Sequence, residues 1–267
     1  MKEHIHNFGA ASQVIPAFEI ERLPRSVYLR SEELSAGQVF ETHSHRWNQL
    51  VYATSGSLVV ILETRRYVIT SEQAIWLPTG TVHASGSLGG AAFRSLYIAD
   101  LPDLAMPDRC SVLQVPIFLR ALIVELSSLA DRAAPTSYVD HLEALILAQL
   151  QQAPRQDFSL PWPQSAGLQR LCEALYQNPA DDRTLDEWGR QLALTTRTLS
   201  RHFEAEVGIT LRHWRLRVRL FRSLEWLGAG RSATEIAMDL GYGSPSAFAY
   251  MFRQEMGCSP AEWQKRA

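Results

Sequence analysis

The chain has 267 residues, 46% of them hydrophobic, which suits one or two domains with substantial cores. Its formal net charge of −2 argues against a nonspecific nucleic-acid coat. The three cysteines lack metal or redox spacing, which favours free thiols. The sequence shows neither an apolar run of signal-peptide length nor 18 uninterrupted apolar residues. We therefore expect a cytoplasmic protein without a membrane span.

Short strands separated by turn residues dominate the first part of the chain. Residues 58–62 and 67–69 flank the polar turn 63–66 and predict a hairpin. Further strands are expected at 39–40, 50–53, 74–77 and 93–98. Many short strands at regular spacing are typical of a sandwich or a small barrel.

Histidines occur at two places in this β-rich part. His43 and His45 stand at i and i+2, which on a strand places both side chains on one face, and His83 can join them from another strand. The spacing Gly37-(x)5-His43-x-His45-(x)3-Gln49-(x)6-Gly56 resembles the first conserved motif of the cupin family, and Pro78-x-Gly80-(x)2-His83 resembles the core of the second. The resemblance covers about residues 30–98 and implies a cupin-like β-barrel.

The chemistry of this site has several interpretations. Three imidazoles from His43, His45 and His83 suit zinc, copper, iron or nickel, so a divalent metal ion is a candidate cofactor. Gln49, the candidate fourth ligand, stands where metal-binding cupins carry glutamate. The amide lacks the negative charge of a glutamate, which should weaken cation binding. Its oxygen can instead accept a hydrogen bond from an organic effector. The alternatives are effector binding without metal and a structural role. Three aromatic residues are candidates for an effector pocket or for the core: Trp47, Tyr52 and Trp76.

Two helices are expected after the barrel, at 116–133 and 136–152, separated at Pro135. The second carries an apolar stripe formed by Val139, Leu142, Leu145/Ile146 and Leu150, which either packs on the barrel or makes a dimer contact. Residues 153–166 contain three prolines and indicate an interdomain linker.

The C-terminal part contains an internal repeat. Residues 241–260 have a degenerate copy 49 residues upstream, in which Leu199, Phe203, Gly208, Thr210 and Trp214 correspond to Phe248, Phe252, Gly257, Ser259 and Trp263. The helix before each copy repeats at an offset of 48, with Thr184, Glu187, Gly189 and Leu192 corresponding to Ser232, Glu235, Ala237 and Leu240. Two copies of a helix, a tight turn and a second helix suggest two similar surfaces for one elongated partner, such as DNA.

Each copy carries the local signals of a helix-turn-helix unit. Both first helices begin with a capping box, and Thr195 and Ser244 are natural N-caps of the second helices, at about 195–206 and 244–256. Apolar residues at i and i+4 of these helices should face the core, which leaves the following residues pointing outward: Arg197, Ser200, Arg201, Ser246, Ala249, Tyr250 and Arg253.

Residues 165–267 resemble the DNA-binding domain of the AraC/XylS family of transcription regulators. The second copy fills every fixed position of the pattern G-[YF]-x-S-x-S-x-F-x-x-x-F-[RK]-x-x-x-G-x-[ST]-P, whereas the first has Ala193 where glycine is usual. The resemblance implies that 211–227 is a long helix joining two helix-turn-helix units, whose recognition helices should lie about one DNA turn, roughly 34 Å, apart.

The outward residues are therefore candidate DNA contacts. Arg197 and Arg201 are the leading base-contact residues of the first unit, because arginine pairs bidentately with guanine. Ser246 and Tyr250 lead in the second unit, which mainly positions the protein on the DNA backbone. A row of arginines on the joining helix contacts phosphates or is simply solvated: Arg212, Arg215, Arg219 and Arg222. Trp214 and Trp263 are expected to pack in the core.

The expected fold is a multi-domain β + α arrangement: a cupin-like sensor β-barrel at 1–108, a helical dimerisation pair with linker at 109–164, and an all-α tandem helix-turn-helix domain at 165–267. The family resemblance implies a homodimeric regulator of promoter DNA, with RNA polymerase as a further partner, whose DNA binding responds to an effector or metal in the barrel. The resemblance does not decide between activation and repression. Of the two, it favours repression, with a neighbouring transporter gene as the target.

Two other functions stay open. A cupin enzyme is the alternative class, but Glu41 and Glu63 are the only carboxylates near the predicted site, and no nucleophile–base pair is visible, so we expect no catalysis. The second alternative is a regulator that responds to no ligand, in which the barrel is only a scaffold for the dimer.

Overall fold

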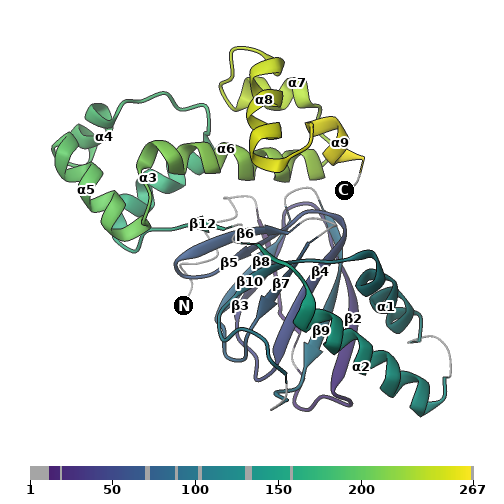
Figure 1. The fold of residues 1–267 in the computed structure, drawn as a ribbon. Helices are drawn as coiled ribbons and strands as arrows, with labels where there is room; N and C mark the ends of the chain where they lie inside the picture. Colours follow the sequence, from purple (N-terminus) through teal and green to yellow (C-terminus); the bar gives the residue numbers. More distant parts are fainter. Residues whose placement is uncertain are drawn as a thin grey trace.

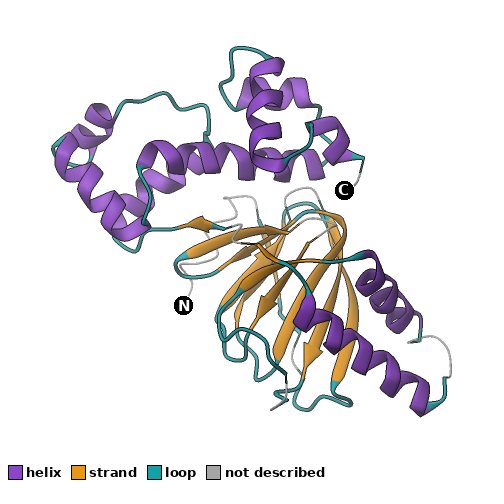
Figure 2. Cartoon of the chain, viewed as in Figure 1, coloured by secondary structure: helices purple, strands orange, loops and turns teal. Residues whose placement is uncertain are grey.

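The computed structural model describes residues 12–18, 20–69, 73–87, 90–101, 104–129, 134–156 and 159–265. A β-rich part carries the first half of the chain and a separate group of helices carries the second (Figure 1). Helices and strands are segregated in the same way when the chain is coloured by secondary structure (Figure 2). The predicted β + α fold class is confirmed.

Two six-stranded sheets form the β-rich part. In spatial order, the first sheet contains β1 (Gln13–Ile15), β3 (Gln38–His43), β8 (His83–Gly86), β5 (Leu58–Ile61), β6 (Arg65–Ile69) and β12 (Leu160–Pro161). The second contains β11 (Arg155–Gln156), β10 (Ser111–Gln114), β7 (Gln73–Leu77), β4 (Asn48–Gly56), β9 (Ala91–Ile98) and β2 (Val27–Leu34). All pairs are antiparallel except β1 with β3, which is parallel.

Side-chain alternation along β4 divides the barrel interior from its outer face. Val51 packs with Leu58, Val60 and Phe93 in the core between the sheets. Its neighbours Leu50 and Tyr52 point the other way, because successive side chains of a strand project to opposite faces. The outer face of the second sheet is therefore apolar and needs cover.

Helices α1 (Ile117–Ser128) and α2 (Thr136–Gln152) provide that cover. Leu119 and Ile123 of α1 and Leu142, Ile146 and Leu150 of α2 are buried against the sheet. The predicted stripe of the second helix thus packs on the barrel, while Leu145 stays 45% exposed. The first helix ends at Ser128, and residues 130–133 of its predicted range lie outside the described part.

The C-terminal part consists, over the described residues, of seven helices: α3 (Ala166–Gln177), α4 (Leu185–Gln191), α5 (Thr196–Val207), α6 (Leu211–Gly228), α7 (Ala233–Asp239), α8 (Pro245–Met256) and α9 (Pro260–Gln264). The 18-residue helix α6 joins the α4–α5 unit to the α7–α8 unit. Both predicted capping boxes are present, Thr184 with Glu187 and Ser232 with Glu235.

The segment predicted as a linker also has regular structure. It forms β11 and β12, and β12 pairs with β6 at the edge of the first sheet. The Trp214 indole on α6 donates a hydrogen bond of 2.7 Å to the Pro161 carbonyl oxygen. The predicted linker therefore contains two short strands, and backbone pairing and the Trp214 indole hold it against its neighbours.

Candidate functional site

Each helix-turn-helix unit turns through one residue with positive φ, which is Ala193 (φ 56°) in the first unit and Gly241 (φ 74°) in the second. The turn is closed by a hydrogen bond from the Leu194 N–H to the Gly189 carbonyl at 2.8 Å. A Cβ on Gly189 would lie 2.6 Å from the Leu194 carbonyl oxygen, so this position needs glycine.

The second helices of both units begin at their predicted caps. The Thr195 hydroxyl accepts from the Thr198 N–H at 3.2 Å, and the Ser244 hydroxyl accepts from the Ala247 N–H at 3.2 Å. Leu199 and Phe203 are fully buried, as are their counterparts Phe248 and Phe252. This inward face fixes which residues of α5 and α8 point outward.

The predicted DNA-contact residues lie on the outer faces of α5 and α8. Arg197, Arg201, Ser246, Tyr250 and Arg253 are exposed, Tyr250 at 70%, while Ser200 and Ser244 are half-buried and Thr195 is exposed.

The two tryptophans that follow the recognition helices belong to the core, as predicted. Trp214 is fully buried with its ring 5.9 Å from that of Phe203, and Trp263 is 7% exposed with its ring 6.3 Å from that of Phe252. Each tryptophan therefore packs against the buried face of a recognition helix.

The structure brings the three predicted histidines together. His43 on β3 and His83 on β8 are paired across the first sheet, and His45 follows β3. One ring nitrogen from each histidine forms a set whose members all lie within 4.8 Å of one another.

Backbone carbonyls orient all three rings. The Nδ1 atoms of His43, His45 and His83 lie 2.8, 2.6 and 3.0 Å from the carbonyl oxygens of Glu41, Trp47 and Thr81. Because a carbonyl only accepts, Nδ1 carries a proton in each ring, which leaves Nε2 of His43 and of His83 as an acceptor. A metal-binding histidine is usually oriented in this way, by a hydrogen bond from the ring nitrogen that does not bind the metal.

Gln49 on β4 reaches the same site from the second sheet. Its Oε1 lies 2.8 Å from Nε2 of His45, and its amide nitrogen donates to the Ser95 hydroxyl at 3.0 Å. Burial lowers the pKa of His43, and burial together with the nearby His43 lowers the pKa of His83 to about 3. Both rings are therefore neutral at pH 7, which is the form that binds metal ions.

A cavity of about 650 Å³ opens beside the histidines. It is lined by Phe18, Glu41, His43, His45 and Tyr97, among others. Sequence analysis missed Phe18 and Tyr97; Tyr97 lies opposite Gln49 in the β4–β9 register, a relation that becomes visible only once the strands are paired.

Of the two roles considered for Tyr52 and Trp76, the structure contradicts the effector pocket and confirms the core. Tyr52 and Trp76 lie on the outer face of the second sheet, packed against α1 and α2, and the Trp76 indole donates to the Pro107 carbonyl at 3.0 Å. The alternation along β4 places Tyr52 on the face opposite to that of Gln49. Trp47 is half-buried, and its carbonyl rather than its ring touches the site, through His45.

Comparison with known proteins agrees with this geometry. Residues 188–266 match a helix-turn-helix domain family, and residues 30–98 match a cupin domain family. The chain is 27% identical to the HTH-type transcriptional regulator NimR of Escherichia coli over 224 residues, covering 84% of this chain and 82% of NimR. It is 25% identical to the HTH-type transcriptional activator RhaS of Escherichia fergusonii, covering 98% and 96% of the two chains.

Among solved structures, ToxT from Vibrio cholerae aligns over 91% of this chain and 98% of its own at 13% identity and a TM-score of 0.38, too low to add to the argument. The two matched domains define a helix-turn-helix transcription regulator with an N-terminal cupin domain. The matched domains and the regulator relatives agree with the resemblance to AraC/XylS-type transcription regulators. Across the described residues, no helix has both the length and the apolar character needed to cross a membrane.

Proposed function

We propose that this protein binds promoter DNA by placing α5 and α8 in successive major grooves, under the control of a ligand in the cupin barrel. The observation that carries the first part is the pair of capped helices that bury one face and expose Arg197, Arg201, Ser246, Tyr250 and Arg253 on the other. Arginines near the N-terminal half of a recognition helix can pair with guanine O6 and N7. Thr195 and Ser244, at the helix starts, can contact phosphate.

Substitution of one arginine tests this assignment. We expect Arg201→Ala to lower affinity for a duplex selected by the wild-type protein by about 1–3 kcal/mol and to relax preference at one base pair. Arg170→Ala removes an exposed arginine of α3 and serves as the control. Fluorescence anisotropy titration measures both, and an Arg201→Ala protein with wild-type affinity and preference would refute the base contact.

The barrel site supports a divalent metal ion as the controlling ligand. The convergent Nε2 atoms of His43, His45 and His83 can provide three ligands, with Gln49 Oε1 available as a fourth. A bound cation would add positive charge between the two sheets. The alternative is an organic effector that occupies the 650 Å³ cavity and forms hydrogen bonds with His43 or His45, which line it.

Metal dependence can be measured directly. We expect zinc, nickel, copper or iron(II) to raise the thermal midpoint, His45→Ala to abolish the rise, and Gln49→Glu to enhance it by supplying a negative charge. DNase footprinting with and without a chelator then tests whether the metal controls DNA binding. A footprint indifferent to chelation, together with no metal-induced shift, would refute the metal and direct the search to an organic effector.

We further propose a homodimer formed through α1 and α2, with domain bounds at 1–108, 109–164 and 165–267. Apolar side chains remain exposed on these helices: Ile117 at 85%, Val124 at 56%, Phe118 at 50%, Tyr138 at 45% and Leu145 at 45%. Repression of a neighbouring gene is our working expectation for the regulatory outcome. Sedimentation of the wild-type chain and of Ile117→Glu tests the dimer.

A further inference from the structure

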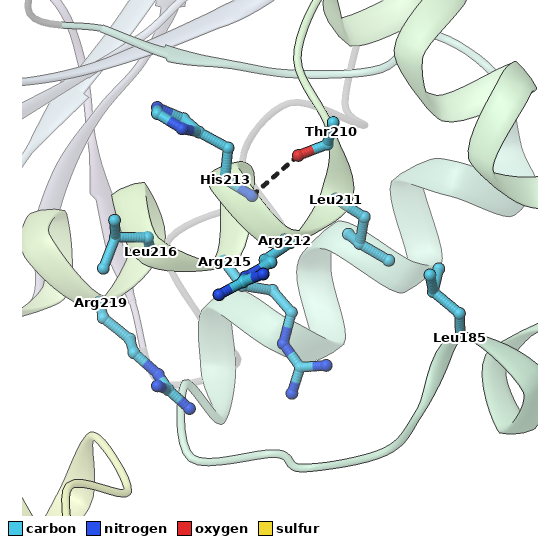
Figure 3. A pocket seen from close by; sticks show the side chains of 8 residues that line it. All are labelled: Leu185, Thr210, Leu211, Arg212, His213, Arg215, Leu216 and Arg219. Atoms are coloured by element: carbon cyan, nitrogen blue, oxygen red, sulfur yellow. Dashed lines mark hydrogen bonds between the residues drawn. The ribbon is translucent and has the colours of Figure 1, made fainter.

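Three arginines of α6 converge on one surface cavity outside the two recognition helices. Arg212, Arg215 and Arg219 line a cavity of about 620 Å³ together with Leu185, Thr210 and Leu211, among others. Figure 3 shows the three guanidinium groups extending from one side of α6. Arg212 is exposed, and the other two are half-buried.

Backbone carbonyls, rather than carboxylates, hold two of these arginines. Arg215 donates to the Arg183 carbonyl at 2.8 Å, and Arg219 donates to the Pro179 carbonyl at 3.1 Å. Over the residues that the structure describes, no carboxylate forms an ion pair with Arg212, Arg215 or Arg219.

Other arginines of the same helical part are neutralised. Arg183, Arg222 and Arg231 form ion pairs with Asp181, Glu225 and Asp239. Burial is the main cause that lowers the pKa of Arg215; the nearby Arg219 lowers it further, and Asp181 and Asp182 act in the opposite direction. Among the described residues the cavity thus gathers three guanidinium groups without an ion-paired carboxylate, and a guanidinium fork matches the oxygens of a phosphate.

The row of arginines runs between the two helix-turn-helix units. At one end Leu185 begins α4, whose next residue, Asp186, accepts a hydrogen bond of 3.4 Å from Thr196 at the start of α5. At the other end the Arg219 guanidinium lies 5.3 Å from the ring of Tyr242, in the turn of the second unit. The row of arginines therefore lies close to a helix-turn-helix unit at each end.

We propose that Arg212 and Arg215, with Arg219 beside them, hold the DNA backbone phosphates that lie between the two major grooves occupied by α5 and α8. This inference rests on the proposed function. Eighteen helical residues span about 27 Å, somewhat less than the roughly 34 Å between successive major grooves on one face of DNA. Over such a distance the duplex presents one phosphate per ~1.7 Å of axis, so phosphates face the helix whatever the base sequence.

Salt dependence separates phosphate contact from base recognition. Each of Arg212→Gln and Arg215→Gln should reduce the slope of log affinity against log salt by about 0.9, the value for one lost phosphate contact. Affinity should fall by the same factor, roughly 5- to 10-fold, for a duplex selected by the wild-type protein and for an unrelated duplex of equal length.

Two further variants control for charge and folding. Arg217→Gln makes the same change on the same helix, but Arg217 faces the Ser159 carbonyl at 3.3 Å, so this variant should keep the wild-type slope. Arg215→Lys keeps the positive charge and should restore much of the slope lost in Arg215→Gln. Circular dichroism at 222 nm verifies that α6 is intact in each.

The possible outcomes are distinct. A wild-type slope in both Arg212→Gln and Arg215→Gln overturns the inference. Inorganic phosphate that stabilises the wild type but not Arg212→Gln at constant ionic strength, with unchanged DNA slopes, assigns the cavity to a free anion and also overturns it. If the wild type binds all duplexes equally and both variants still show a smaller salt-dependence slope than the wild type, the proposed base contacts are refuted and the phosphate contact is supported. A wild type without affinity for any duplex refutes both.

Discussion

Single residues decide whether the two helix-turn-helix units are equally stable. The turn of the first unit places Ala193 at φ 56°, where the second has Gly241 at φ 74°. A left-handed conformation costs a residue with a Cβ about 1–2 kcal/mol, whereas glycine adopts it freely. The first unit therefore carries local strain that the second lacks.

We expect Ala193→Gly to raise the free energy of unfolding by about 1 kcal/mol, since the relief of strain exceeds the added entropy of the unfolded chain. The reciprocal change, Gly241→Ala, should lower it, because the new Cβ would lie 3.1 Å from the Ala180 Cα in addition to being strained. Urea denaturation followed by circular dichroism measures both. Destabilisation by Ala193→Gly would contradict this account of the turn.

At the scale of elements, a side chain outside α3 satisfies the start of that helix. The Ser165 hydroxyl makes no capping bond, and Glu206 of α5 instead accepts from the backbone N–H groups of Gln164 and Ser165, both at 3.0 Å. A carboxylate at this end also complements the helix dipole. Burial raises the pKa of Glu206, but the hydrogen bonds from Ser165 and Gln164 outweigh it, and the pKa is lowered.

This contact predicts a pH dependence. A carboxylate whose folded pKa is lowered contributes stability that is present above its unfolded value of about 4.5 and is lost as pH falls through the lower folded value. The wild type should therefore be more stable than Glu206→Gln at pH 7, and the difference should shrink below about pH 4. Thermal unfolding over this pH range measures it; a difference that is constant with pH would exclude the carboxylate's charge as the cause.

Local signals explain how much of these elements could be predicted. Capping boxes, the N-caps Thr195 and Ser244 and the internal repeat act within a few residues, so the two recognition helices and the helix that joins the units were predicted nearly to their bounds. Strands such as β8, with the sequence HASG, carry no periodic apolar signal and were missed. For Tyr52 and Trp76 the sequence left both pocket and core open, because strand alternation gives two faces but does not say which of them lines the barrel interior.

For the whole molecule, Arg66 of β6 is the centre of the contact between barrel and helices. It is 1% exposed, lies 3.4 Å from the Trp162 ring centroid and 4.6 Å from that of Tyr176, and pairs with Glu173 on α3 at 2.9 Å. The Tyr176 hydroxyl in turn donates to Glu225 of α6. The sheet that carries His43 and His83 is thus the sheet that touches the helical part.

We expect Arg66→Met to weaken this contact by about 2 kcal/mol, since a charged hydrogen bond and a cation–π contact are lost together. Proteolysis between residues 153 and 165 should accelerate, whereas Arg109→Met, a change at an exposed barrel arginine, should leave the rate unchanged. If cleavage of Arg66→Met proceeds at the wild-type rate, Arg66 does not hold the two parts together.

The close approach of α6 to the barrel limits which domains can be recombined between related regulators. A Cβ on Gly228 would lie 2.9 Å from the Ser57 hydroxyl oxygen, and β12, which precedes the helical part in sequence, pairs with β6 of the barrel. A gene fusion that joined this barrel to the helices of a relative would therefore have to bring residues matched to Ser57, Arg66 and Leu160 with it. Recombination within the family is accordingly expected to preserve these contacts as a set, so that a barrel and the helices it regulates are inherited together.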